Sequence, residues 1–443
     1  MNLKLNRELI EARKQNIKLY TIYRAISMDL IFYYAIEYLF LTEVKGLSAA
    51  SFVLGSAFFA TFMMIMQIPA SILIDKIGTR RCTIVANIFN IIFLLFILKT
   101  NTLKDLIFAQ FISALCFSFK NISDTALLQY SIPETRKKGE IFSKVEGKGK
   151  MNYHYLNAIT SIFAGLLYVI NPYAPMICSL CFAATATIIS LGFEEMKRFR
   201  IRKKMTILER TKRYVKDFNS TIKFITNSQR LRSIFLYSGI VWGILSLVGI
   251  YKNGLFIDIG VPAQIITTIT AILSVAVAQG SKLQIQFHKF FRNKGLSVVL
   301  IIITVSITLA GIVGNLHLSY IVSIILISIF LIFTYFGKGL SEVLISRYLG
   351  NFTNNKVLTQ IIAMNEFSRN FFRAIVSFIG AYIINITNAS NALIITGLFS
   401  FVLTFSLISY MKTRLGLKPE EYKEGEIILN KEKEKEIEKK IEN

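Results

Sequence analysis

The sequence predicts an all-α, polytopic membrane protein with twelve transmembrane helices in two pseudo-symmetric six-helix bundles. Three observations predict this fold class. First, 53% of the 443 residues are hydrophobic and the mean hydropathy is +0.52, while 18% are charged against about 25% in an average soluble domain. Second, the apolar residues gather in runs of spanning length. Third, one long basic stretch divides these runs into two sets of six.

A transmembrane helix needs about 20 predominantly apolar residues. Such runs occur at residues 19–42, 49–73, 82–98, 105–126, 152–170, 173–193, 233–257, 262–281, 296–314, 318–337, 363–386 and 389–411. The first run is too long for a signal peptide and contains Asp29 and Glu37, so we expect a retained first span. The eleventh run is the least apolar, because Glu366, Arg369 and Arg373 lie in its first half.

The distribution of Lys and Arg predicts how the chain crosses the membrane. Residues 194–232 hold thirteen basic against four acidic residues, and residues 134–150 are also basic, whereas the alternate connecting segments carry few charges. Basic loops stay on the cytoplasmic side. We therefore expect a multi-pass protein of the inner (plasma) membrane with both termini cytoplasmic. The net charge of +24 is then an orientation signal, and no nucleic-acid partner is expected.

The predicted organisation has five parts: a cytoplasmic N-terminal segment, a first bundle, a cytoplasmic central loop, a second bundle and a charged cytoplasmic tail. Their bounds are residues 1–18, 19–193, 194–232, 233–411 and 412–443.

The two bundles carry traces of a duplication. Residues 119–124 (FKNISD) parallel residues 337–342 (GKGLSE) at an offset of 218, and residues 46–49 (GLSA) parallel residues 260–263 (GVPA) at an offset of 214. Both parallels fall at equivalent places in the two halves. An internal repeat of this kind is typical of secondary transporters.

The loop between the second and third spans carries the strongest motif, with Asp75, Lys76, Gly78, Arg80 and Arg81 in the run DKIGTRR. The glycine permits a tight turn, and the acid can accept hydrogen bonds from a helix N-terminus. The cations can pair with acids or with phosphate head groups.

This motif resembles the signature of the major facilitator superfamily of secondary transporters. With the twelve spans and the repeat, the resemblance covers about residues 15–415. One departure is Ser71, where the family usually has glycine, and the equivalent second-half stretch at residues 288–294 (HKFFRNK) lacks the acid and the glycine. The resemblance implies that the first copy acts as a cytoplasmic gate motif, which latches the two halves when the cavity opens outward. The alternative is a plain anchor at the inner interface.

The resemblance also implies that spans 1, 4, 7 and 10 line a central cavity. Charges within spans are costly and are functional candidates, and spans 1 and 4 carry several: Arg24, Asp29, Glu37, Lys120 and Asp124. Asp29, Tyr33 and Glu37 follow at i, i+4 and i+8, so we expect them to share one face of a helix that runs through the first span. Spans 1 and 4 should bring these residues to similar depths in the membrane, so we expect Lys120 to pair with Asp29 and Asp124 to pair with Arg24.

These charges give two interpretations. If the pair of Lys120 and Asp29 breaks when Asp29 takes up a proton, proton flow is coupled to the opening of one side. The alternative is fixed ion pairs that only specify helix packing. In the second half, Lys338 and Glu342 form a possible second gate, or lie at the interface with lipid head groups. Trp242 on span 7 adds aromatic character to the expected cavity, which would suit amphipathic solutes, cationic ones included.

The sequence lacks a Gly-rich phosphate loop, a Ser/His/Asp set and a Cys/His cluster, so we expect neither an enzyme nor a bound cofactor or metal. We predict a monomeric carrier whose partners are a small-molecule substrate, protons or another cation, and the bilayer. We expect it to work by alternating access and to export an amphipathic, drug-like compound in exchange for protons. Export is favoured because spans 1 to 3 resemble those of bacterial efflux carriers, although the fifth span lacks the Gly-Pro pair that many of these carriers have. The alternatives are cation-coupled uptake of a small nutrient and a non-transporting membrane receptor or scaffold.

Overall fold

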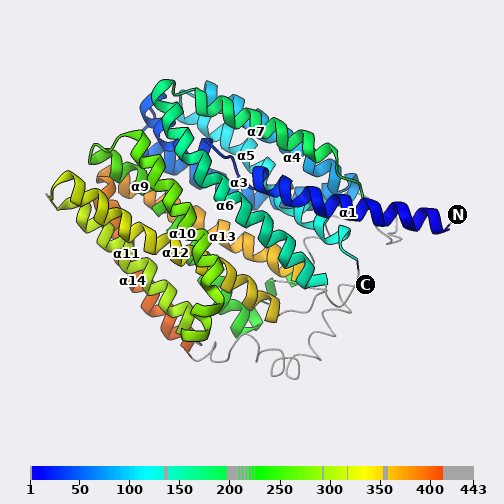
Figure 1. Cartoon of the computed structure of the whole chain (residues 1–443). Coiled ribbons are helices and arrows are strands. Elements are labelled where there is room, and N and C mark those ends of the chain that lie inside the picture. Colours follow the sequence, from blue (N-terminus) through cyan, green and yellow to red (C-terminus); the bar gives the residue numbers. More distant parts are fainter. Residues whose placement is uncertain are drawn as a thin grey trace. The chain divides into compact units, whose positions relative to one another are not determined.

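The computed structural model describes residues 2–133, 138–196, 225–291, 294–316, 318–352 and 358–412, with scattered residues between 209 and 223. Within these residues the regular elements are helices (Figure 1). They are α1 Asn2–Ser27, α2 Tyr33–Leu39, the π-helix η1 Phe40–Val44, α3 Ala49–Ile77, α4 Thr79–Lys99, α5 Leu103–Ser131, α6 Lys138–Ile170, α7 Ala174–Leu191, α9 Gln229–Asp258, α10 Ala263–Phe291, α11 Gly295–Asn315, α12 Tyr320–Phe352, α13 Leu358–Ile386 and α14 Ala389–Lys412. Most of the predicted central loop, and the predicted tail after Lys412, lie outside the described residues.

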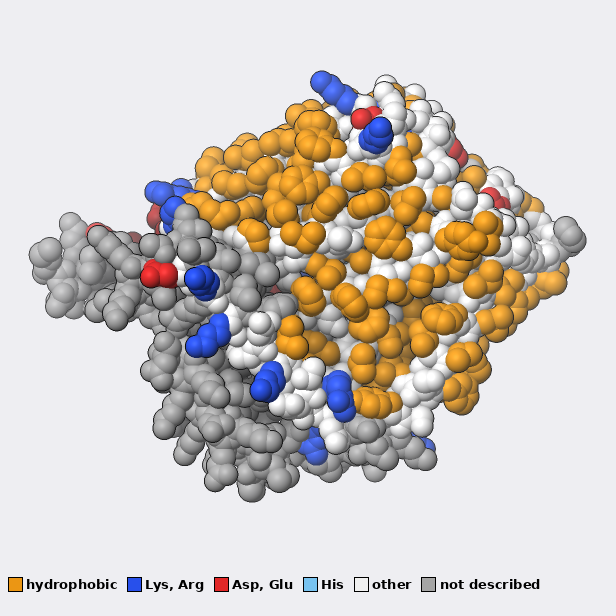
Figure 2. All heavy atoms as spheres, turned by 180° about the vertical axis from the view of Figure 1, so that it is seen from behind, with side chains coloured by type: hydrophobic (Ala, Val, Ile, Leu, Met, Phe, Trp, Pro, Cys, Tyr) orange, Lys and Arg blue, Asp and Glu red, His pale blue; other side chains and the backbone are white. Residues whose placement is uncertain are grey.

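Ten of the described helices are long and apolar enough to cross a membrane. The other two of the twelve expected spans are α13, which carries Glu366, Arg369 and Arg373, and the first span, which is broken. Large apolar side chains are exposed along the helices, and in Figure 2 they cover most of the described face, with the few charged side chains toward its margins. Such an extensive apolar surface requires lipid rather than water around it. The chain is a multi-pass membrane protein.

The prediction of one continuous helix over residues 19–42 is wrong. Helix α1 ends at Ser27, and the backbone becomes irregular until α2 begins at Tyr33. The Oδ1 atom of Asp29 accepts a hydrogen bond from the backbone N–H of Leu30 (3.2 Å), and the carbonyl of Asp29 accepts one from Ile31 (3.2 Å). The carboxylate of an aspartate can in this way take a backbone N–H group away from the i→i−4 hydrogen bonds of a helix. Phe32 completes the break with a φ of 67°, a left-handed conformation that strains a bulky residue.

The chain forms two compact units: Met1–Met205 with Gly260–Val275, and Thr206–Ile259 with Ala276–Asn443. In the first unit α1 packs on α6, α4 on α5 and α4 on α7. In the second unit the corresponding helices repeat these pairs: α9 packs on α13, α11 on α12 and α11 on α14. The predicted duplication is therefore present as a repeated packing scheme.

Two glycine turns mark the same point of each repeat. Gly46 has a φ of 69° and Gly260 a φ of 81°, a region that favours glycine. Each turn is followed three residues later by the start of a long helix, α3 at Ala49 and α10 at Ala263. The parallel between residues 46–49 and 260–263 thus corresponds to the same local structure.

Candidate functional site

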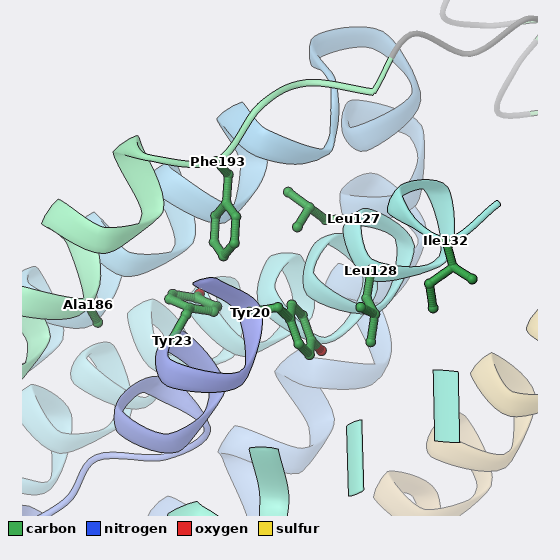
Figure 3. Packing of buried hydrophobic residues seen from close by; sticks show 7 residues of the cluster. All are labelled: Tyr20, Tyr23, Leu127, Leu128, Ile132, Ala186 and Phe193. Atoms are coloured by element: carbon green, nitrogen blue, oxygen red, sulfur yellow. The ribbon is translucent and has the colours of Figure 1, made fainter. Parts of the chain in front are cut away.

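A cluster of buried aromatic and aliphatic side chains fixes α1 in the first unit. The cluster, shown in Figure 3, consists of Tyr20, Tyr23, Leu127, Leu128, Ile132, Ala186 and Phe193. The ring of Tyr23 meets the ring of Phe193 edge to face at 5.2 Å between centroids. Because Tyr20 and Tyr23 come from α1 and Leu127 and Leu128 from α5, this packing sets the position of Arg24 relative to Asp124.

Arg24 lies at the centre of a buried ion network. Its Nη1 atom is 3.7 Å from Oδ2 of Asp124, which is the pair that the sequence predicts. Its Nη2 atom is 3.2 Å from Oε1 of Glu146, and the hydroxyl of Tyr20 donates to the other oxygen of that carboxylate at 2.7 Å. Lys150, half-exposed, lies 3.6 Å from Glu146. The network joins α1, α5 and α6.

Lys120 is fully buried beside this network. Its ammonium donates to the hydroxyl of Tyr23 at 3.0 Å and to Oδ1 of Asn87 at 2.9 Å, and it lies 4.0 Å from Oδ2 of Asp124. Thr83 donates to the other oxygen of Asp124 at 3.0 Å. The charge of Lys120 is therefore solvated by side chains of α1, α4 and α5. Its predicted pairing with Asp29 stays a prediction.

Sequence reasoning missed several members of this network, among them Asn87, Thr83 and Glu146. Asn87 and Thr83 are uncharged polar residues in the third apolar run, where a buried amide or hydroxyl indicates a hydrogen-bonding partner nearby. Glu146 falls in the basic stretch 134–150, which we expected to be a loop. The structure instead begins α6 at Lys138, so Glu146 occupies a helix face that packs against α1.

The other candidates of the first span lie on both sides of its break. Asp29 is half-buried within the irregular segment, so it does not share a continuous helix face with Tyr33 and Glu37 as we expected. Tyr33 and Glu37 both belong to α2, and the hydroxyl of Tyr33 donates to Oε1 of Glu37 at 3.0 Å. Tyr33 is fully buried and meets Phe93 of α4 edge to face at 5.6 Å.

The motif between the second and third spans forms a tight turn. Helix α3 ends at Ile77, Gly78 has a φ of 104°, and α4 begins at Thr79. Glu195, which sequence reasoning missed, caps α4: its Oε1 accepts from the N–H and hydroxyl of Thr79, and its Oε2 accepts from the N–H of Arg80, all at 2.9 Å. A carboxylate at a helix N-terminus pairs with free N–H groups and with the helix dipole.

The remaining motif residues take distinct places. The Nη2 atom of Arg80 donates to the carbonyl of Leu191 at 2.7 Å, which ties the turn to the end of α7. Lys76 and Arg81 are exposed. The side chain of Asp75 lies outside the described residues. The turn is thus held by Glu195 and Arg80, while two cations face outward.

In the second unit, Trp242 of α9 lies between two cations. The Lys338 ammonium is 5.4 Å from the centroid of the indole ring, and the Arg369 guanidinium carbon is 5.0 Å from it. Arg369 also pairs with Glu366 at 2.8 Å. Glu342, the repeat equivalent of Asp124, is half-buried one helical turn after Lys338. Among the described residues, no group of three or more His, Cys, Asp or Glu side chains could hold a metal ion.

Solved structures share this architecture. A mutant of the nucleoside transporter NupG superposes with a TM-score of 0.69 at 11% identity, covering 90% of this chain and 99% of that one. A POT family transporter in complex with a thioalcohol-conjugated peptide gives a TM-score of 0.66 at 13% identity, covering 92% and 96%. At these identities the likeness concerns the fold. No curated protein has a significantly matching sequence.

The family model described as Major Facilitator Superfamily matches residues 19–336, which is more than half of the chain. The match spans the glycine turn with its exposed cations, the buried charges of spans 1 and 4, and most of the second unit. With the repeated six-helix packing, it identifies the chain as a member of the Major Facilitator Superfamily of membrane transporters.

Proposed function

We propose that this transporter couples the movement of a small organic solute to a proton gradient, with Asp29 as the group that carries the proton. The observation that carries this proposal is the break in the first span. Non-helical backbone at membrane depth is tolerated where it is buried in protein or lines a water-filled cavity. In transporters, discontinuous helices of this kind form the sites for substrates and coupling ions.

Proton uptake at Asp29 would change the local structure as well as the charge. The ionised carboxylate accepts the hydrogen bond from Leu30, whereas a protonated carboxyl is a weaker acceptor and gains a donor. The strained conformation of Phe32 lies three residues away. A segment with few regular hydrogen bonds can change its shape at low cost, so protonation would bias the two access states of the carrier.

The buried ion network of Arg24 and Lys120 lies next to this segment and would hold α1 in place. Arg24 and Lys120 are held by Asp124 and Glu146 at distances of 3.2 to 4.0 Å. We propose that this network keeps α1 on α5 and α6 while the residues after Ser27 rearrange. Tyr33 and Glu37, hydrogen-bonded to each other, would line the same cavity on the far side of the break.

We further propose that the turn at Gly78 is the cytoplasmic latch. The exposed cations Lys76 and Arg81 can pair with acidic groups or lipid phosphates, and the rigid turn presents them at a fixed point. With this assignment, both termini and the long basic loop would lie in the cytoplasm, as the positive-inside rule predicts.

The direction of transport that we propose is export, supported by the resemblance of the first three spans to efflux carriers. Uptake of a small nutrient is the alternative. A strain lacking the protein, tested for growth against toxic compounds and on limiting nutrients, separates the two. Export predicts greater sensitivity to at least one compound. A deletion strain that is starved of one nutrient and no more sensitive to any compound contradicts export.

Coupling is tested in everted membrane vesicles with a preformed pH gradient. Addition of the transported compound should dissipate the gradient in vesicles with the wild-type protein, and this response should be lost with Asp29→Asn. A matched control is Glu43→Gln, which changes an exposed carboxylate in η1, directly after the first span. Dissipation by Asp29→Asn at the wild-type rate would exclude Asp29 as the coupling group.

A further inference from the structure

The second unit gathers positive charge inside its helices. Residues 240–256 of α9, 330–345 of α12 and 363–376 of α13 contain four cations, Lys252, Lys338, Arg369 and Arg373, and two carboxylates, Glu342 and Glu366. Lys252 is 6% exposed, and its ammonium donates to Oδ1 of Asn253 at 3.0 Å. Charges within membrane spans are costly and are functional candidates.

The corresponding helices of the first unit carry more carboxylates for their cations. Spans 1 and 4 contain two cations, Arg24 and Lys120, against three carboxylates, Asp29, Glu37 and Asp124, and the counterpart of α13, α6, adds Glu146 with Lys148 and Lys150. Lys120 and its repeat equivalent Lys338 show the difference most directly. Lys120 lies 4.0 Å from Asp124, whereas the contacts of Lys338 are with the rings of Trp242 and Tyr335, at 5.4 and 5.8 Å from the ring centroids.

The cations of the second unit follow α9 as a strip with aromatic rings between them. Arg369 and Lys338 lie at Trp242, and the hydroxyl of Tyr335 lies 3.8 Å from the point where a Cβ on Gly249 would stand. Lys252 comes ten residues after Trp242, which is about 15 Å along the helix. The strip therefore offers two cations and an indole ring at one end, the ring of Tyr335 beside them, and a third cation, Lys252, at the other end.

We propose that this strip binds the transported solute and that the solute is an organic anion, with a carboxylate or phosphate group held by Lys338 and Arg369 and an apolar part on Trp242. The inference rests on the proposed transport function and names its substrate class. Ammonium and guanidinium groups bind such oxygens with charge-assisted hydrogen bonds. A bound anion would also neutralise the excess charge of α9, α12 and α13. This assignment differs from the cationic solutes that the acids of the first span suggest.

Trp242 is the one tryptophan of the chain, so the tryptophan fluorescence of the purified protein reports on this strip alone. The test titrates detergent-solubilised protein, at constant ionic strength, with four probes that share one ring: benzoate, phenyl phosphate, neutral benzyl alcohol and cationic benzylamine. We expect saturable changes in emission with the two anions, at concentrations at least about tenfold below those of the other two probes. Equal or stronger binding of benzylamine or benzyl alcohol, or no response to any probe, overturns the proposal.

Variants separate the strip from general effects of charge. Lys338→Gln should weaken anion binding at least about tenfold, and Lys338→Arg should retain most of it, since the charge is kept. The matched control is Lys282→Gln on the exposed face of α10, which should bind as the wild type does. Wild-type affinity in Lys338→Gln overturns the proposal. Because this readout requires binding but no transport, failure of coupling in vesicles would contradict the proposed function and leave the anion site testable by itself.

Discussion

Gly78 is constrained in two ways that together exclude any other residue. Its φ of 104° is reached freely by glycine alone, and a Cβ built there would lie 2.7 Å from Oε2 of Glu195. The side chain of Glu195 could avoid the clash only by giving up its hydrogen bonds to the start of α4. The turn and the cap therefore depend on each other.

We expect Gly78→Ala to destabilise the protein by about 1–3 kcal/mol, because the new methyl group adds backbone strain and displaces the cap. Gly147→Ala is the matched control, since a Cβ there meets no atom within 4 Å. Thermal unfolding in detergent measures both variants. A Gly78→Ala protein that unfolds at the wild-type temperature would mean that Glu195 does not depend on this glycine.

The buried pair of Lys120 and Asp124 offers a second test at the scale of single residues. Both side chains are at most 1% exposed. Removing Asp124 leaves the buried charge of Lys120 without a carboxylate, and removing Lys120 leaves Asp124 with Arg24 as its cation, and breaking a buried pair in this way costs about 3–5 kcal/mol. We expect Lys120→Met and Asp124→Asn each to lower the unfolding temperature strongly. The double variant should lose less than the two single losses combined, because it removes both charges.

The control for this cycle is Lys99→Met, which replaces an exposed lysine at the end of α4 and should change stability little. Strictly additive losses from Lys120→Met and Asp124→Asn would show that the two charges do not stabilise each other.

Of the two pairs that the sequence predicted from helix depth, the structure contains Arg24 with Asp124, while Lys120 with Asp29 stays a prediction. Arg24 and Asp124 face each other because two spans of known direction bring them to one level. Glu195 and Glu146 could not be found in this way. Each lies outside the apolar runs, and its role depends on which helix end or helix face the folded chain brings beside it.

At the scale of elements, apolar runs predicted the long helices because burial in lipid forces their backbone to be helical. This argument fails for the first span. Its composition is that of a continuous span, but local hydrogen bonds of Asp29 and the positive φ of Phe32 interrupt it. Hydropathy does not register such a break, since the same apolar residues remain buried on both sides.

The break predicts a specific pattern of amide exchange. Residues 29–32 lack the regular i→i−4 hydrogen bonds of a helix, so their amides should exchange faster than those of α1 before Ser27 and those of α3. Hydrogen–deuterium exchange with mass spectrometry of the protein in lipid nanodiscs measures this. Slow exchange across residues 20–40 without a step would contradict an unwound segment at Asp29.

At the scale of the whole molecule, the two bundles and the repeat could be predicted from the basic central stretch and from two short sequence parallels. The repeat is closer in packing than in sequence: α1 on α6 matches α9 on α13, while Lys120 keeps an acidic neighbour and Lys338 packs on aromatic rings. Helix packing depends mainly on side-chain volume and tolerates substitution. Charges, in contrast, have diverged between the halves.

That divergence suits a carrier with two tasks. The first unit would hold the proton site at Asp29, beside the carboxylates of spans 1 and 4, and the second unit would hold the solute, beside the cations of α9, α12 and α13. Proton and solute then act on different units of the same molecule, and each biases the access equilibrium by its own preference for one state. The sequence could not predict this division, because the cations of α9, α12 and α13 are far apart in the chain.

The most direct test of this account compares proton-driven transport with solute exchange in proteoliposomes, once a solute is identified by the vesicle assay. Wild-type protein should perform both, and so should Glu43→Gln. Asp29→Asn should lose accumulation driven by a pH gradient by at least about tenfold but retain exchange of labelled for unlabelled solute. Accumulation at the wild-type level in Asp29→Asn would contradict the central claim that the unwound first span couples the proton to transport.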